Sequence, residues 1–216
     1  MRAVRALWLA ATLLVAPAAH AADTCHIALG RGWPPATENY GTAVEKLFAV
    51  GSMPALSFTL LPRTGAETGL LLIADPKGGD WNLRYSVADE RVHYWNGNRL
   101  EFRTAQTPDI QEVPMPAAVA SRLVEDWRRA LTIAAPEGST APFSENDSWL
   151  FVAGDLRVSG LRPECKLGEQ LREQIELLIE ASDEGEEKRE KRWRQLGESL
   201  DRMRATLDAM SANAAQ

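Results

Sequence analysis

The chain has 216 residues, of which 45% are hydrophobic, and it carries 30 acidic residues against 24 basic ones. A chain of this length can form one ordinary domain with its own hydrophobic core. The net charge of −6 makes nucleic acid and anionic membrane surfaces poor partners, because both carry the same sign of charge as the protein.

Residues 1–21 have the three parts of a cleavable secretory signal peptide. Arg2 and Arg5 form a short positive region, an apolar run follows, and Ala19-His20-Ala21 supplies a small-x-small cleavage pattern. The apolar run is too short to anchor the chain in a bilayer. We therefore predict a Sec-type signal peptide cleaved after Ala21 and a periplasmic or secreted protein, with no integral membrane segment after cleavage. Removal of the two arginines leaves 22 basic residues against 30 acidic ones, a net charge of −8.

The predicted mature chain contains two cysteines, Cys25 and Cys165. In an oxidising compartment an isolated pair is most simply a structural disulfide. It would close a long loop, a constraint worth about 5 kcal/mol in the chain-entropy model. The alternative is a redox or metal-binding pair, but the sequence has neither the C-x-x-C spacing nor histidines nearby at ligand spacing.

Elements of both types are predicted in the first half of the mature chain. Residues 26–37 are rich in Gly and Pro and indicate an irregular segment, and a short helix over 38–50 ends at Gly51. Residues 54–105 then predict a meander of about five antiparallel strands. These strands are expected at 55–61, 68–74, 81–87, 91–95 and 99–104. Asn96-Gly97 between the last two predicts a type I′ hairpin turn.

A long amphipathic helix is predicted after Pro116, a residue suited to the first turn of a helix. Its apolar stripe recurs every four residues and is expected to lie on one face of the sheet. The stripe consists of Val119, Leu123, Trp127 and Leu131. A polar loop over 136–147 leads to two further strands, at 149–153 and 156–159.

The remainder of the chain, after Cys165, is predicted to be helical, with a break or bend at 182–185. The first part should pack on the body, whereas the second is rich in acid–base pairs at i,i+4 spacing that support a solvated helix. These patterns predict an α+β protein: an antiparallel meander against a long amphipathic helix, with a C-terminal helical extension. Its parts would be a signal peptide (1–21), an α+β domain (22–182) and a charged helical extension (183–216).

The charged extension also carries an apolar seam, defined as six side chains spaced alternately three and four residues apart. They are Trp193, Leu196, Leu200, Met203, Leu207 and Met210. This a/d pattern is typical of a coiled coil, although it covers fewer than three heptads. One interpretation is a helical hairpin folded back on the body. The other is a contact with a second copy or with another envelope protein.

No motif for catalysis, metal binding or a cofactor is present: G-x-S-x-G, H-E-x-x-H and the P-loop are all missing. An imidazole and a carboxylate could meet at Asp89, Glu90 and His93, but the same residues are ordinary in a solvated sheet. Trp33, in a Trp-Pro-Pro segment, could anchor a partner or fold down over the core near the disulfide.

Three functional hypotheses follow. The leading one is a non-enzymatic accessory or inhibitor-like factor that binds another protein. The second is a small envelope hydrolase whose site is assembled from residues distant in sequence. The third is a carrier of a small or lipidic ligand held between sheet and helix.

Overall fold

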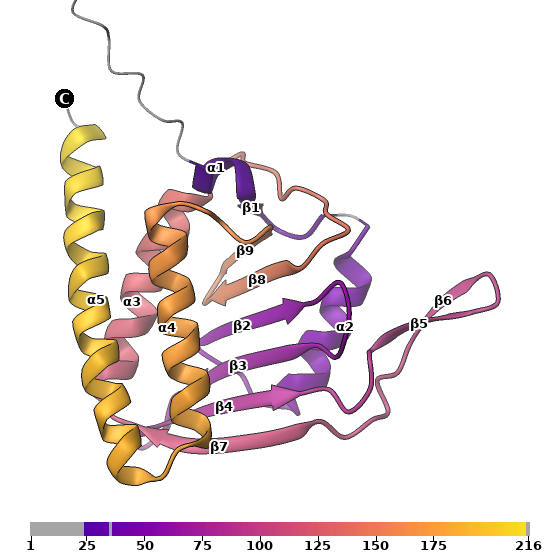
Figure 1. Ribbon diagram of the computed structural model, residues 1–216, viewed down its shortest axis with the longest axis horizontal. Coiled ribbons are helices and arrows are strands. Elements are labelled where there is room, and N and C mark those ends of the chain that lie inside the picture. Colours follow the sequence, from indigo (N-terminus) through magenta and orange to yellow (C-terminus); the bar gives the residue numbers. More distant parts are fainter. Residues whose placement is uncertain (1–23, 35, 215–216) are drawn as a thin grey trace, which may run out of the picture.

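The computed structural model describes residues 24–34 and 36–214, and the predicted signal peptide lies outside these residues. The helices are α1 (Thr24–Ala28), α2 (Glu38–Ala49), α3 (Ala117–Ala134), α4 (Lys166–Asp183) and α5 (Glu186–Ala214). The strands are β1 (Leu29–Arg31), β2 (Leu56–Leu61), β3 (Thr68–Ile73), β4 (Trp81–Val87), β5 (His93–Asn96), β6 (Arg99–Phe102), β7 (Asp109–Met115), β8 (Ser148–Ala153) and β9 (Leu156–Gly160). Figure 1 shows their arrangement.

A seven-stranded antiparallel sheet forms the centre of the molecule, in the order β1-β9-β8-β2-β3-β4-β7. The meander β2-β3-β4 forms its middle, and the β8-β9 hairpin pairs with β2 on one side. Along each central strand apolar side chains alternate between two buried faces, as in Leu70, Leu71 and Leu72 of β3. The predicted α+β class with an antiparallel sheet and packed helices is confirmed.

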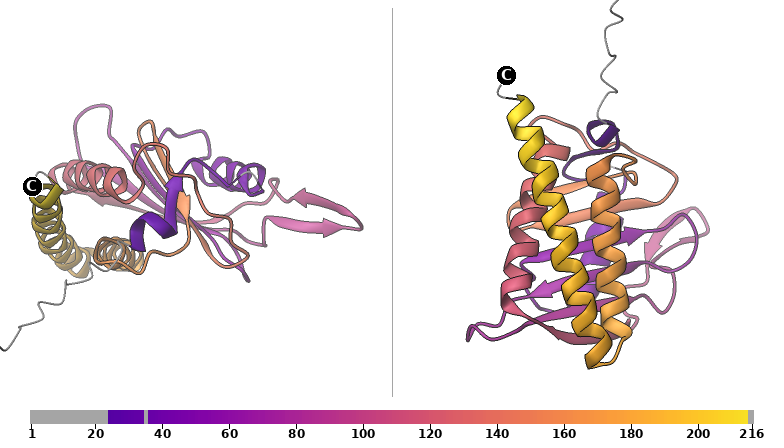
Figure 2. Two further views of the ribbon diagram at one scale, coloured as in Figure 1. Left: turned by 90° about the horizontal axis from the view of Figure 1, so that it is seen from above. Right: turned by 60° about the vertical axis from the view of Figure 1, so that its left-hand side comes forward.

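Helices cover the two faces of this sheet unequally. On one face α4 lies over β3, β4 and β7, and α3 lies over β8 and β9. α5 packs against both helices and forms an outer layer, as Figure 2 shows. On the other face the short helix α2 packs against β2 and β3. The chain therefore has a large core under α3 and α4, and a second, smaller core under α2.

The break predicted at 182–185 is confirmed, because α4 ends at Asp183 and α5 begins at Glu186. The two helices run back along each other, so the ion pairs of α5 reach across to its neighbours. Arg192 pairs with Glu180 of α4, and Arg202 pairs with Glu173 at 2.5 Å. The buried carboxylate of Asp126 on α3 accepts hydrogen bonds from Arg204 at 2.9 and 3.1 Å.

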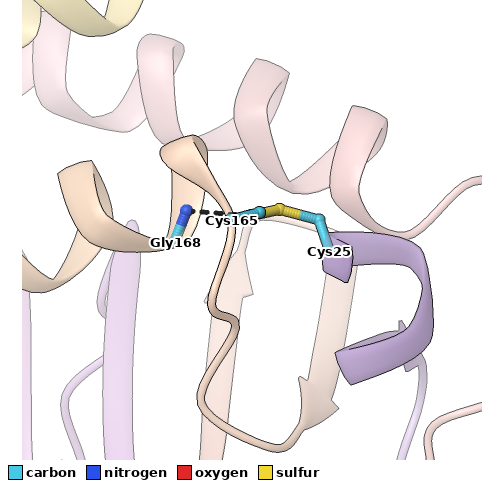
Figure 3. Close-up of a disulfide and its surroundings, with 3 residues drawn as sticks. All are labelled: Cys25, Cys165 and Gly168. Carbon is cyan, nitrogen blue, oxygen red and sulfur yellow. Dashed lines mark hydrogen bonds between the residues drawn. A yellow bond between two sulfur atoms is a disulfide. The ribbon is translucent and has the colours of Figure 1, made fainter. Parts of the chain in front are cut away.

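The predicted disulfide between Cys25 and Cys165 is present, with the two Cα atoms 5.5 Å apart (Figure 3). It joins the N-terminal helix α1 to the start of α4. Cys165 is also the N-cap of α4, where its Sγ accepts a hydrogen bond from the backbone N–H of Gly168 at 3.1 Å. The bond thus fastens the beginning of the chain to the large core.

The predicted five-stranded meander is wrong in its last two members. β5 and β6 pair only with each other, and the main sheet continues from β4 to β7, a strand that the sequence pattern did not indicate. β7 is an edge strand, where Pro114 and surface charges are tolerated because one side makes no ladder bonds. β1, in the segment expected to be irregular, adds a three-residue strand at the opposite edge.

The turn between β5 and β6 also differs from the predicted type I′. Asn96 pairs with Arg99, so the two central residues are Gly97 and Asn98. Gly97 has φ +62°, whereas Val50 is the one non-glycine residue with positive φ in the described part of the chain. A positive φ at the first central residue alone, with Gly there, is typical of a type II′ turn.

Candidate functional site: the projecting hairpin

The β5–β6 hairpin projects from the body beyond the end of the main sheet (Figures 1 and 2). Because side chains alternate along a strand, the register divides the hairpin into two faces. One face carries the opposed pairs His93–Phe102 and Trp95–Leu100. The other carries Tyr94–Glu101 and Asn96–Arg99. The hairpin is therefore amphipathic, with one apolar and aromatic face.

The apolar face is covered near the body and open at the tip. Tyr40 of α2 packs edge-on against His93, with ring centroids 4.6 Å apart, and stacks on Phe102 at 6.2 Å. The outer pair has no such cover: the Trp95 side chain is 68% exposed and that of Leu100 is 42% exposed. The row of apolar side chains thus runs from the smaller core out into solvent.

Contacts on the polar face stabilise the hairpin. They are needed because an isolated two-stranded ribbon is only marginally stable in water. Tyr94 donates a 2.6 Å hydrogen bond to Glu101, which also accepts one from Asn96 at 3.1 Å. The Arg103 guanidinium lies 3.9 Å from the centroid of the Tyr94 ring and pairs with Glu90 at 3.1 Å. These contacts hold the two strands together where no helix covers them.

A buried carboxylate organises the base of the hairpin. Glu67 is fully buried; it accepts a hydrogen bond from the hydroxyl of Tyr40 and another, of 2.9 Å, from the backbone N–H of Val92. Burial and this bond to Glu67 raise the pKa of Tyr40 above its usual value, so the phenol stays protonated and acts as the donor. The bonds link α2, the segment before β3 and the start of β5.

Arg91 is the other charged residue at the base of the hairpin, and its guanidinium donates to uncharged acceptors. Its guanidinium donates to the backbone oxygens of Arg63 and Pro62, at 2.6 and 3.0 Å, and to Nδ1 of His93 at 3.2 Å. Burial and the nearby Arg91 charge lower the pKa of His93. An imidazole that accepts a bond at Nδ1 is neutral, in agreement with this direction.

The possible acid–base group does not form in this arrangement. His93 contacts Arg91 and Tyr40, whereas the carboxylate of Glu90 pairs with Arg103. In the part of the chain that the structure describes, no three His, Cys, Asp or Glu side chains are grouped so that they could hold a metal ion. Nor is any described helix both long and apolar enough to cross a membrane.

The apolar seam faces the body of the protein and not solvent. Five of its six residues are buried between α5 and the helices α3 and α4, and Met210 is partly buried against the same core. The buried five are Trp193, Leu196, Leu200, Met203 and Leu207. Of the two interpretations of the seam, the structure shows the one in which the helix folds back on the body. The seam then presents no open apolar stripe to a partner.

Trp33 also folds down, but not beside the disulfide. Its ring packs on Gly41 of α2, where a Cβ atom would come within 2.2 Å of the indole. The Arg157 guanidinium lies 5.6 Å from the centroid of the same ring. Trp33 thus belongs to the smaller core under α2, whereas Cys25 belongs to the large one.

Trp95 is the exposed aromatic residue of the hairpin, and its sequence pattern indicated only that it belongs to a strand. Its position, one residue before the Asn96-Gly97 pair that predicts a hairpin turn, was the available indication, because turns and loop tips lie at the protein surface. Comparisons of the chain with protein-family models, with curated proteins and with solved structures find no match.

Proposed function

We propose that this chain is an exported, non-enzymatic accessory protein that acts by binding another protein, and that the tip of the β5–β6 hairpin is its contact. The observation that carries the proposal is the opposed pair Trp95 and Leu100, exposed at the end of a braced, projecting ribbon. Exposed tryptophan is costly in solvent, and it is enriched among the residues that dominate binding energy.

The partner that fits this tip is a protein with an apolar pocket about the size of one aromatic ring. The residues next to the pair along both strands are polar and stand on the opposite face of the ribbon: Asn96, Arg99 and Glu101. An apolar, aromatic contact bordered by polar residues is the usual anatomy of a protein interface. A bilayer surface suits the tip less well, since a mature charge of −8 opposes approach to anionic lipids.

The experiment compares three baits built on residues 22–216: the wild type, Trp95→Ala and Phe143→Ala. Phe143 is a matched control, because it is another exposed aromatic side chain, 58% exposed, in a loop of the main body. Each bait captures proteins from an extract of the envelope, and the captured protein is then purified and titrated calorimetrically. We expect a 1:1 complex that Trp95→Ala weakens about 30-fold or more and that Phe143→Ala leaves unchanged.

Two outcomes would contradict the proposal. One is a set of captured proteins that Trp95→Ala and wild type retain equally, since the tip would then contribute nothing. The other is Trp95-dependent binding to vesicles of zwitterionic or anionic lipid without any protein partner, which would make the tip a membrane contact. The export part has its own test, which is recovery of the chain outside the cytoplasm with Ala22 as its first residue.

A further inference from the structure

A groove of about 370 Å³ lies on the other side of α2 from the hairpin, between this helix and the outer face of the sheet. Strand register sets its floor: Val152 of β8, Ser57 of β2 and Leu71 of β3 stand opposite one another in a row. The rest of its lining comes from α2, the segment after it, and two further strand residues. Those that bear on ligand binding are Glu45, Lys46, Ala49, Met53 and Arg157.

The groove is open because two small side chains, one from the sheet and one from helix α2, face each other there. Larger side chains at these two positions would fill it. Ser57 is the middle residue of the floor, and Ala49 is the last residue of α2. Arg84 and Arg157 occupy the two ends of the same row and hold the helix in place. Arg157 pairs with Glu45 at 2.6 Å, and Arg84 donates to the carbonyl oxygen of Ala49 at 3.1 Å.

Apolar side chains near one end of the groove are exposed to solvent. Met53 is 91% exposed and lines the groove, and Val50 next to the helix end is 60% exposed. Val50 has φ +45° as the C-cap of α2, and left-handed backbone is common where a helix ends. The exposed Met53 side chain thus gives the groove one apolar end in contact with solvent.

The charge beside this apolar floor is positive. Among the described residues the ammonium of Lys46 forms no ion pair, whereas the charge of Arg157 is already matched by Glu45. Lys46 lies on the exposed side of α2, one helical turn before Val50. The groove therefore combines a largely apolar floor, the exposed Met53 at one end and one cation without an ion pair among the described residues.

We propose that this groove binds a single-chain amphiphile with an anionic head group, the class to which fatty acids belong. The chain lies between Ala49 and the floor residue Ser57, and the head group meets Lys46. The volume is at the lower end of the range for small-molecule sites, about 300–1,000 Å³, and is too small for a helix or a folded domain. The site is separate from the hairpin tip, so it does not depend on the function proposed above.

The test uses the mature chain, residues 22–216, with dodecanoate as the probe and isothermal titration below its micelle concentration. Dodecyltrimethylammonium is the matched ligand control, because it has the same chain and the opposite head-group charge. The groove variants are Ser57→Leu and Ala49→Leu, which fill it from the floor and from the helix. The charge variant is Lys46→Glu, and Phe143→Ala is the control outside the groove.

We expect one dodecanoate per chain, no comparable binding of the cationic amphiphile, and loss of binding in a filled variant that retains the wild-type circular dichroism. Lys46→Glu should weaken binding about tenfold or more, while Phe143→Ala leaves it unchanged. Three results would overturn the proposal: no binding of dodecanoate, equal binding of both amphiphiles, or full binding in a folded variant whose groove is filled. Because Ser57→Leu and Ala49→Leu approach the groove from opposite walls, one variant that fails to fold leaves the other as the test.

Discussion

The indole Nε1–H of Trp127 donates a 2.6 Å hydrogen bond to Oε1 of Gln174, and both side chains are fully buried between α3 and α4. The amide of Gln174 in turn points its Nε2 at the hydroxyl of Ser199 on α5, 3.4 Å away. One polar residue therefore links the three helices of the large core. A buried amide is stable there only because both of its polar atoms have partners.

Replacing Gln174 by Leu should lower the free energy of unfolding by about 2 kcal/mol, since the Trp127 Nε1–H would stay buried without an acceptor. The double variant Trp127→Phe/Gln174→Leu should lose less free energy of unfolding than Trp127→Phe and Gln174→Leu lose together, because no indole donor is then left unpaired. Urea unfolding of all four proteins measures the coupling. Additive losses would show that the hydrogen bond contributes nothing beyond packing.

Deletion of residues 184–216 should expose the apolar surfaces of α3 and α4 rather than release an independent extension. The deletion removes five buried apolar side chains, each worth about 1.5–3 kcal/mol, and their sum rivals the whole stability of an ordinary domain. We expect a chain that aggregates or binds a hydrophobic dye, as judged by light scattering and dye fluorescence. A soluble truncated monomer with cooperative unfolding would instead favour a seam that serves a partner.

Cys165 has two structural roles that substitutions can separate. Both Cys25→Ala/Cys165→Ser and Cys25→Ala/Cys165→Ala remove the disulfide, and each should be about 3–5 kcal/mol less stable than the oxidised wild type. The serine variant keeps an N-cap acceptor for the Gly168 N–H. Its free energy of unfolding should therefore be about 1 kcal/mol higher than that of the alanine variant. Chemical unfolding under non-reducing conditions gives both differences. Equal stability of the two double variants would rule out a capping role.

Acidification should destabilise the base of the hairpin through His93. Its pKa is lowered in the folded protein, by burial first and then by Arg91, so the fold favours the neutral imidazole. The stabilisation is fully present above the unfolded-state pKa of about 6.5 and is lost as the pH falls from there through the lower folded-state pKa. Arg91 and Glu67 are the charged groups that face the ring, and the effect of a half-buried group should stay below about 1 kcal/mol.

The measurement for His93 is the free energy of unfolding between pH 7.5 and pH 5.5, compared in wild type and His93→Gln. The wild type should lose more stability over this interval than the variant, which has no imidazole to protonate. Parallel curves for the two proteins would mean that other groups carry the pH dependence. Tryptophan fluorescence is a suitable second probe, because Trp95 lies two residues away on the same face of the hairpin.

Much of the fold was predictable because its determinants are local. The meander β2-β3-β4, the amphipathic helix α3 and the break before Glu186 follow from periodicity, turn residues and charge, all of which act over a few residues. The disulfide followed from a count of two cysteines in a chain predicted to be exported. The strand β7 was missed because its pattern is weak: Val113 and Met115 face inward, but Gln111 and Pro114 interrupt the signature of a strand.

The candidate site could not be predicted in the same way. A strand pattern of alternating apolar residues is the same whether a tryptophan in it is exposed or buried. Trp95 is exposed because the hairpin runs away from the main sheet. The groove beside α2 likewise depends on the register that brings Ser57 between Val152 and Leu71. Strand register and the position of a helix over a sheet both depend on contacts between segments distant in the chain, so the residues next to a position in sequence do not predict them.

By itself, the sequence determined the chemistry of each segment: an N-terminal segment typical of export, antiparallel strands, amphipathic helices and one apolar seam on a charged helix. The tertiary structure decided what that seam contacts, because the same a/d pattern buries equally well against a second chain or against α3 and α4. It also decided which apolar side chains stay in solvent, at the hairpin tip and at Met53. Burial results from contacts between segments distant in the chain, and a local pattern specifies only that a face needs cover.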